Sequence, residues 1–344
     1  MMSMPLKDES PYNDTVISSR VRMARNMNDF FFPTIKDPNL GEKVIEKVFD
    51  SIREGPEEIY REFQLNRIKE LTKIQRLELV EKHLISPQLA ENQDTGALVY
   101  NKKENLIIMI NEEDHIRIQA LLPGLQLEKV LESANDMDDL IEEKVDYAYD
   151  EAFGYLSACP TNTGTGMRAS VMLHLPALAR SMEIQEMLHF ASKMGLAVRG
   201  VYGEGSGFTG NMYQVSNQVT LGISEEEIIQ KIQEITLQII HKERSLRQEL
   251  VRTQPMEIED QIYRSLGILQ RARIISAEEG MKLLSNIHLG ISVGIIKNIE
   301  LDEIHGLITM IQPGSLQVAF GKELDQRSRD FQRGKLLREK LKNW

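Results

Sequence analysis

Apolar and polar residues alternate in several short segments of the chain, and this alternation predicts β-strands. The predicted strands are ALVYN at 97–101, NLIIMIN at 105–111, HIRIQAL at 115–121, ASVMLHL at 169–175, LAVRGVY at 196–202 and MYQVSNQVTL at 212–221. The first two flank the polar tripeptide KKE and therefore predict a hairpin. Strands that follow one another without regular intervening helices favour an antiparallel sheet over a doubly wound parallel one.

Apolar residues at helical spacing cover much of the remaining chain. The predicted helices span residues 42–63, 72–83, 125–150, 179–194 and 224–250, and Thr72 is the expected N-cap of the second. Beyond Thr253, Gln254 and Pro255 we expect a mostly helical segment, 256–344. The predicted fold class is α+β, with an antiparallel sheet flanked by helices and a smaller helical C-terminal domain.

Composition narrows the class of protein. The formal net charge of −11 and the pI near 5.3 argue against a nucleic-acid binder, which usually carries a basic face. The single cysteine excludes an intrachain disulfide framework, and the seven histidines show no paired metal spacing. The N-terminal MMSMPLKDESP lacks an apolar signal core, and the longest aliphatic run is residues 106–110. We therefore expect a cytoplasmic enzyme without a protein-bound metal, a membrane span or a direct nucleic-acid partner.

Arginines recur in segments that also contain glycines, acids or the lone cysteine. These segments are SSRVR at 18–22, NEEDHIR at 111–117, CPTNTGTGMRAS at 159–170, RGVYGEG at 199–205 and RDFQRG at 329–334. Guanidinium groups are the preferred bidentate partners of phosphate. The pattern predicts a nucleotide-phosphate site built from arginines. Glu112, Glu113 and Glu204 lie in the same segments and suggest that a cation is held opposite the phosphate.

Each segment has a simpler explanation beside the functional one. Arg20 and Arg22 share one face if their segment is extended, but they could also be solvated arginines on an edge strand. The acids of NEEDHIR could form only surface salt bridges with Arg117, which contribute little. The acid of RGVYGEG, Glu204, could be the exposed residue of a hairpin turn.

The cysteine segment is the most specific of the five. Three hydroxyl-bearing residues and two glycines lie between Cys159 and Arg168, so the backbone could approach a ligand closely and offer its amides to an anion. Thr161 could donate a hydrogen bond to a Cys159 thiolate. A lone cysteine is more often an inert buried thiol, but the glycine and threonine context favours a functional one.

One further motif is rejected. Residues 205–210 match GxGxxG, but a dinucleotide-binding loop of that pattern is followed by a helix, whereas residues 211–221 alternate like a strand. The chain also has no GxxxxGK[ST], no HRD and no DFG motif, so P-loop and eukaryotic-type kinase machinery are absent from the sequence.

The order of the first four segments resembles the ATP:guanido phosphotransferase family, which includes arginine and creatine kinases, over residues 15–245. In the small-substrate kinases of that family a helical domain precedes SSRVR, whereas here only 17 residues do. The chain continues instead through a helical region at 255–344. This layout resembles that of the bacterial protein-arginine kinases, and we expect a catalytic domain at 15–245 and a regulatory, phosphoarginine-binding domain at 255–344.

The resemblance implies roles for individual residues. The implied nucleotide-binding residues are Ser18, Ser19, Arg20, Val21, Arg22, His83, Arg117, Arg168, Ala169, Ser170, Val171, Met172, Arg199, Gly200, Val201, Tyr202, Gly203 and Glu204. Those implied to face the guanidinium acceptor are Glu113, Cys159 and Glu204. The implied allosteric phosphoarginine motif is Arg329, Asp330, Arg333 and Gly334, the last of which departs from the alanine of the family pattern.

The expected reaction is in-line transfer of the γ-phosphoryl group of ATP to a guanidinium nitrogen, which depends on positioning and charge neutralisation. Glu113 or Glu204 would act as base, with Glu113 as first choice, and Mg²⁺ would be held mainly through the ATP phosphates. The resemblance also implies arginine-bearing protein substrates, a small activator protein, the Clp protease machinery, heat-shock regulation and a homodimer. Two alternatives remain open: a kinase of free arginine or another small guanidino compound, and a non-catalytic phosphoarginine-binding adaptor.

Overall fold

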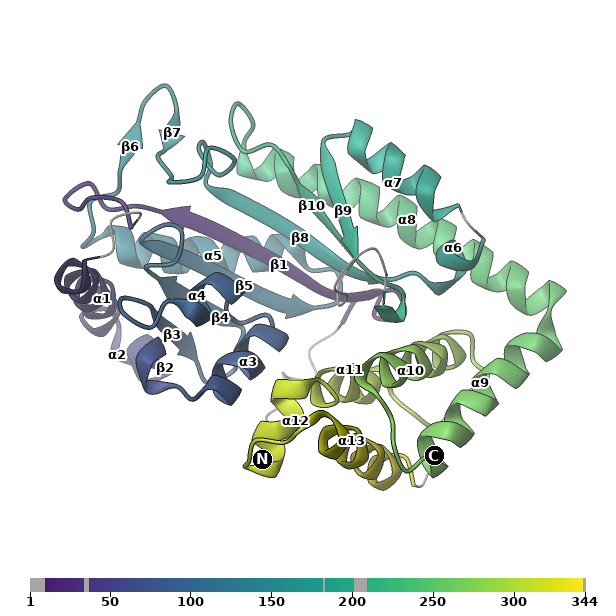
Figure 1. The fold of residues 1–344 in the computed structure, drawn as a ribbon. Coiled ribbons are helices and arrows are strands. Elements are labelled where there is room, and N and C mark those ends of the chain that lie inside the picture. Colours follow the sequence, from purple (N-terminus) through teal and green to yellow (C-terminus); the bar gives the residue numbers. More distant parts are fainter. Residues whose placement is uncertain (1–9, 34–36, 182, 201–208, 343–344) are drawn as a thin grey trace. The chain divides into compact units, whose positions relative to one another are not determined.

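The computed structural model describes residues 10–33, 37–181, 183–200 and 209–342 (Figure 1). An eight-stranded sheet has the order β2-β3-β4-β5-β1-β8-β10-β9, and β6 and β7 form a separate hairpin. The strands are β1 Val16–Arg25, β2 Phe63–Arg67, β3 Ala97–Asn101, β4 Leu106–Ile110, β5 Ile116–Pro123, β6 Tyr149–Asp150, β7 Gly154–Tyr155, β8 Met167–His174, β9 Leu196–Gly200 and β10 Met212–Asn217. Consecutive strands β3, β4 and β5 pair antiparallel, as predicted.

The helices account for most of the remaining described residues. They are α1 Pro38–Arg53, α2 Glu57–Tyr60, α3 Lys73–Glu81, α4 Pro87–Glu91, α5 Leu127–Glu142, α6 Pro176–Arg180, α7 Ile184–Lys193, α8 Glu225–Thr253, α9 Pro255–Arg271, α10 Ala277–Ser292, α11 Leu301–Met310, α12 Pro313–Phe320 and α13 Gln326–Lys340. The described chain after Pro255 contains helices and no strand, and the α+β class is confirmed. None of the described helices is long and apolar enough to cross a bilayer.

Several predicted boundaries were wrong. The helix predicted at 42–63 is two helices, because Gly55 and Pro56 separate α1 from α2, and its last residue already belongs to β2. The helix predicted at 125–150 ends at Glu142. Thr72 is the N-cap of α3, where its side chain accepts a hydrogen bond from Gln75 N.

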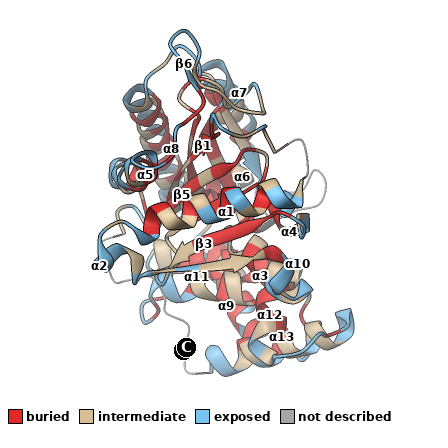
Figure 2. Ribbon diagram, turned by 90° about the vertical axis from the view of Figure 1, so that its left-hand side faces the viewer, coloured by how far each residue is buried: buried red, intermediate tan, exposed pale blue. Residues whose placement is uncertain are grey.

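The chain divides into two compact units, each made of several segments, and each is described by itself. The first comprises Ser10 and the described residues of 18–171 and 216–233. Its sheet strands are largely buried, while α1 alternates between buried and exposed positions, as Figure 2 shows. The residues at the core beside α3 and α4 are Ile68, Leu79, Leu84, Ile85, Leu89, Leu98, Ile107 and Met109.

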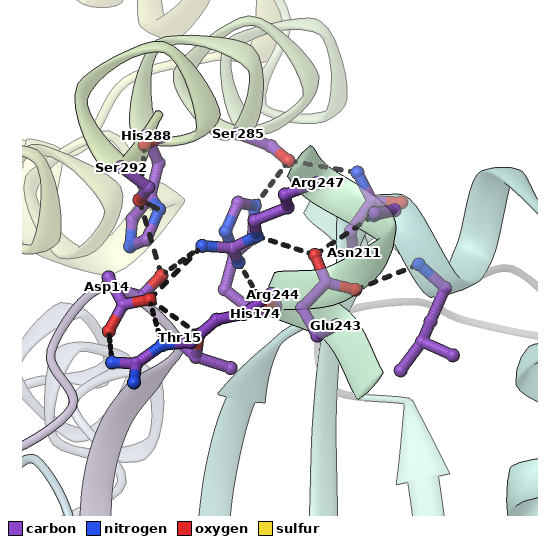
Figure 3. A network of polar contacts seen from close by, with 12 residues as sticks. Asp14, Thr15, His174, Asn211, Glu243, Arg244, Arg247, Ser285, His288 and Ser292 are labelled. Atoms are coloured by element: carbon purple, nitrogen blue, oxygen red, sulfur yellow. Dashed lines mark hydrogen bonds and ion pairs between the residues drawn. The ribbon is translucent and has the colours of Figure 1, made fainter. Parts of the chain in front are cut away.

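The second unit comprises the described residues of 11–17, 172–215 and 234–344. Apolar residues of α9, α10, α11 and α13 form its core. A buried polar network adjoins this core (Figure 3). In it Glu243 accepts hydrogen bonds from Ala177 N and Leu178 N at 3.0 and 2.8 Å, and it pairs with Arg247 at 2.7 Å.

Candidate active site

Strand β1 places Arg20 and Arg22 on one face of the sheet. The intervening positions face α5, because Ser19 Oγ accepts a hydrogen bond from Gln126 N and Arg25 pairs with Asp138 of α5 at 2.6 Å. Side chains alternate along a strand, so Arg20 and Arg22 lie on the opposite face of the sheet from α5. β1 lies between β5 and β8, so the possibility that SSRVR is an edge strand is excluded.

The two strands that flank β1 each contribute one more arginine to this face. Arg117 lies on β5 and Arg168 on β8, two residues before Ser170, whose hydroxyl accepts a hydrogen bond from Arg20 Nε at 3.3 Å. Burial lowers the pKa of the Arg22 guanidinium well below its usual range, and the positive charges of Arg20, Arg117 and Arg168 lower it further. Arg20, Arg117 and Arg168 are therefore close enough to Arg22 to repel its positive charge.

A polyanion fits this arginine face. Nε of Arg22 is buried and has no hydrogen-bond partner among the described residues. A buried donor without a partner costs free energy, as does the accumulation of like charge. Phosphate oxygens would satisfy both, because each accepts charge-assisted hydrogen bonds from guanidinium groups. The residues present thus fit the phosphates of a nucleoside triphosphate.

His83 borders the arginine face from the turn after α3. It adopts a left-handed backbone conformation with φ of 58°, and its carbonyl accepts a hydrogen bond from Gln119 Nε2 at 2.8 Å. Burial, together with the charges of Arg20 and Arg22, lowers the pKa of His83 to about 4. Its imidazole is therefore neutral at physiological pH, which suits packing against an uncharged ring such as adenine.

The acids of NEEDHIR lie in the turn between β4 and β5, at the start of the strand that carries Arg117. Glu112 Oε2 is 2.5 Å from Arg117 Nη1, and Glu113 Oε2 is 3.1 Å from Arg117 Nη2. The Glu112 side chain is 2% exposed and the Glu113 side chain 37%, so only the second is accessible to an acceptor. Glu112, which the sequence pattern had grouped with Glu113 and Glu204 as acids opposite the phosphate, is instead the buried partner of Arg117.

Cys159 lies in a compact loop that precedes β8. Its Sγ is 3.1 Å from Thr161 Oγ1, so the predicted contact is present. The loop amides, however, bind the protein: Asn162 N donates to Cys159 O, and Thr165 N donates to Thr220 O. Gly164 is required because a Cβ there would lie 2.2 Å from Thr220 O, at a φ of +113°. The glycines therefore serve packing within the protein, which the pattern alone did not reveal.

The turn between β4 and β5, which carries Glu112 and Glu113 and is called the acid turn below, is bonded to the cysteine loop. Asp114, the residue after Glu113, accepts a hydrogen bond from Ala158 N, the residue before Cys159, at 2.7 Å. Two of the three residues predicted to face the acceptor are thus brought together by a direct contact between their neighbours. The third, Glu204, lies outside the described residues.

Other predicted nucleotide residues are placed less simply. Val21, Ala169 and Val171 are fully buried, so their side chains do not reach a ligand on the sheet surface. Ser19 is also buried and faces α5. Ser18 and Met172 are half-buried. Arg199 and Gly200 are exposed at the end of β9 in the second unit, and positions 201–203 lie outside the described residues.

The motif RDFQRG forms part of α13. Arg333 is 1% exposed, and its guanidinium donates to Ile311 O at 2.7 Å, Ile275 O at 2.8 Å and Asp330 Oδ1 at 2.6 Å. Arg329 donates to Leu324 O and remains half-buried. At Gly334 a Cβ would lie 2.7 Å from the carbonyl oxygen of Arg273, so an alanine here would require the backbone to move.

Comparison with known proteins agrees with this fold. The sequence model of the ATP:guanido phosphotransferase C-terminal catalytic domain matches residues 43–246. The model of the protein-arginine kinase McsB C-terminal domain matches residues 255–344. The solved structure of lombricine kinase shares the fold with a TM-score of 0.61 at 23% identity, over 72% of this chain and 70% of that one.

Curated relatives are similar over nearly the whole chain. A protein-arginine kinase of Geobacillus sp. (strain WCH70) is 46% identical over 337 residues, which cover 98% of this chain and 93% of the relative. The protein-arginine kinase of Caldanaerobacter subterraneus subsp. tengcongensis is 48% identical over 328 residues, 95% of this chain and 97% of the relative. The chain belongs to the ATP:guanido phosphotransferase family, in its protein-arginine kinase branch. An ATP-dependent kinase activity follows from that membership.

Proposed function

We propose that this protein transfers the γ-phosphoryl group of ATP to arginine side chains of proteins. The observation that carries the proposal is the face formed by Arg20, Arg22, Arg117 and Arg168, with accessible Glu113 at its end. Phosphoryl transfer depends on positioning and on neutralising the charge of the phosphates. The fixed guanidinium groups provide both for a triphosphate, and the nearby carboxylate provides for a cationic acceptor.

The acceptor chemistry falls to the acid turn and the cysteine loop. Arginine has a pKa above ~12, so its nitrogen becomes nucleophilic only as a proton leaves. Glu113 accepts that proton as general base and binds the guanidinium through its second oxygen. The family resemblance assigns Glu204, which lies outside the described residues, as a second carboxylate for the acceptor. Cys159 as thiolate binds the cationic acceptor electrostatically, without forming a covalent intermediate.

Mg²⁺ is proposed to bind mainly through the ATP phosphates. Within the described residues no cluster of three or more histidines, cysteines or acids could hold a metal ion. The arginine face would hold the phosphates, and the ion would supply further neutralisation of their charge when bound.

The direct test is incubation with ATP, Mg²⁺ and an arginine-rich protein substrate, followed by detection of acid-labile phosphate on arginine. We expect phosphoarginine on the substrate with the wild-type protein and its loss with the Glu113→Gln and Arg22→Gln variants. Phosphate on serine or threonine, or no transfer to any protein, would contradict the proposal.

Two other functions are separated by the same assay. A small-substrate kinase would phosphorylate free arginine and leave the protein substrate unmodified. A non-catalytic adaptor would bind phosphoarginine through RDFQRG without transfer to any acceptor. The paired state of Glu113 and Arg117 favours an active enzyme, because a binding module has no need for an acid beside a phosphate-binding arginine.

The wider setting is proposed from the family resemblance. We expect a cytoplasmic homodimer with a small activator protein, whose substrates are passed to the Clp protease machinery and include heat-shock repressors. The C-terminal region at 255–344 would act as the regulatory domain, with the half-buried Arg329 and Asp330 of α13 contacting phosphoarginine and the buried Arg333 holding them in place.

A further inference from the structure

Asp114 lies in the same turn as Glu113, contacts the loop that carries Cys159, and is fully buried. Its Oδ1 accepts one hydrogen bond from Ala158 N and another from Asn26 Nδ2, both at 2.7 Å. Glu113 directly precedes the aspartate, and Cys159 directly follows the alanine. One carboxylate oxygen therefore sets the spacing of two residues that face the acceptor.

Asn26 completes this arrangement from the end of β1. Its Oδ1 accepts a hydrogen bond from His115 N at 2.9 Å, and its Nδ2 also donates to Leu156 O at 3.1 Å. The asparagine thus binds both the acid turn and the cysteine loop, and it is only 1% exposed. We call Asn26, Asp114 and their bonds to both loops the acceptor clamp.

The two hydrogen bonds of the clamp require an accepting oxygen at position 114 but not a charged side chain. Its Oδ2 is buried and has no hydrogen-bond partner among the described residues. An amide oxygen could accept the same two hydrogen bonds without burying a negative charge, and an unsatisfied buried charged group is costly. The charge lies in the same turn as Glu112 and Glu113, where a cationic guanidinium is expected.

We infer that Asp114 is a positioning residue for the acceptor. Through Asn26 and Ala158 it holds Glu113 and Cys159 at a fixed separation, and its buried charge adds to the negative potential at the guanidinium. The identity of the acceptor rests on the proposed function, whereas the clamp rests on the hydrogen bonds alone. A residue that served only folding would change stability without changing acceptor binding or the chemistry of the thiol.

Two substitutions separate the geometry from the charge. Asp114→Asn keeps an accepting oxygen and removes the charge, while Asp114→Ala removes both. For each variant the KM for a protein substrate, the KM for ATP and the rate of Cys159 alkylation by iodoacetamide are measured. The chain has one cysteine, so a single mass increment reports that residue.

Asp114→Asn should raise the KM for the protein substrate about tenfold, as expected for one charge lost beside a cation in a partly screened site. The KM for ATP should stay within about twofold, because the hydrogen bonds of the clamp run to Ala158, Leu156 and His115 and not to the strands' phosphate-binding positions. Alkylation should accelerate in Asp114→Asn and more strongly in Asp114→Ala, which frees the loop. Asn26→Ser should resemble Asp114→Ala, and the double variant should be less than additive.

Asp150→Ala is the matched control. Asp150 likewise accepts two backbone amides, from Ala152 and Phe153 at 2.8 and 3.1 Å, but both lie within the β6–β7 hairpin. It should leave all three measurements unchanged. The inference is overturned if both Asp114 variants keep wild-type acceptor KM and alkylation rate, or if the control shifts them equally.

Failure of the proposed function is a separate outcome. If no variant, wild type included, phosphorylates arginine while the Asp114 variants still accelerate alkylation, the clamp stands and the assigned acceptor is wrong. If Asp114→Ala does not fold, Asp114→Asn and Asn26→Ser carry the comparison.

Discussion

Arg117 donates from Nη2 to Glu113 Oε2 at 3.1 Å, while its Nη1 is bound by Glu112 at 2.5 Å. The two acids differ in exposure, with 37% of the Glu113 side chain accessible against 2% for Glu112. Glu112 is therefore the anchor that orients the guanidinium, and Glu113 is the acid that remains able to contact an acceptor.

Substitution of the two acids should have different consequences. Glu113→Gln removes the proposed base and should lower kcat by about 100-fold or more, with little change in the KM for ATP. Glu112→Gln removes the buried partner of Arg117 and should mainly raise the KM for ATP. Steady-state kinetics with a protein substrate measure both. Wild-type kcat in Glu113→Gln would rule out its role as base.

Arg22→Gln should separate binding from stability. Burial and the charges of Arg20, Arg117 and Arg168 disfavour the cation at this position in the absence of nucleotide. The variant should unfold no more easily than wild type without ATP, yet bind ATP about tenfold to 100-fold more weakly through loss of a charged hydrogen-bond donor. Thermal unfolding with and without nucleotide measures both effects. Arg61→Gln, which removes an exposed partner of Glu57, is the control and should change neither.

Gly164 of the cysteine loop can be compared with Gly222, which lies between β10 and α8. Gly164→Ala places a Cβ 2.2 Å from Thr220 O and should destabilise the protein by about 3 kcal/mol, because backbone must move. Gly222→Ala also adds a Cβ at positive φ, +74°, but meets nothing within 4 Å, so about 1 kcal/mol is expected. Urea unfolding of both variants measures the difference. Equal losses would mean that φ, not the close approach, decides.

The local sequence pattern was sufficient to predict some features of the fold and of the candidate site. Alternation predicted β3, β4 and β5, and the spacing of Arg20 and Arg22 placed both on one face before their neighbours were known. β2 was missed because its FQLNR follows a strongly helical segment, and its strand conformation depends on pairing with β3. Propensity alone does not reveal such a tertiary partner.

Burial and long-range contact account for what the sequence could not show. Glu112 and Glu113 are adjacent acids of the same type, and only the fold makes one an anchor and the other accessible. Arg25 lies three residues beyond Arg22 and was passed over. It is buried, bound to Asp138, and stacked 3.6 Å from the centroid of the Tyr155 ring. No spacing rule points to that partner.

Acid should destabilise the second unit through its buried histidines. The rings of His174 and His288 are 4.1 Å apart between centroids, and His288 Nε2 is 3.0 Å from His305 Nε2. Burial lowers the pKa of all three, to about 4 for His305, and Arg247 lowers those of His174 and His288 further.

The sign of this effect follows from proton uptake. Unfolded histidine has a pKa near ~6.5, so between that pH and about 4 the unfolded chain binds more protons than the folded one. Stability should be constant above pH ~6.5 and fall as the pH decreases below it. Urea unfolding from pH 8 to 5 measures the slope, and His288→Gln should reduce it. A flat profile would contradict the prediction.

Replacing Gly334 of RDFQRG by alanine should lower the stability of this protein. Gly334→Ala gains helix propensity of about 1 kcal/mol, but its Cβ would lie 2.7 Å from Arg273 O. Moving helix α13 away from that carbonyl costs about 2 kcal/mol, so a net loss near 1 kcal/mol is expected. Thermal unfolding measures it. A stabilised variant would show that α13 can shift freely.

Helix α6 has no side-chain cap of its own, because Leu175 is its N-cap residue, and Glu243 supplies acceptors for its first amides instead. That glutamate emerges from the ribosome 66 residues after Ala177. The first turn of α6 therefore has no stabilising partner during synthesis until most of α8 has been made. Residues 176–180 should consequently be among the last of their unit to become protected from hydrogen exchange in a growing chain.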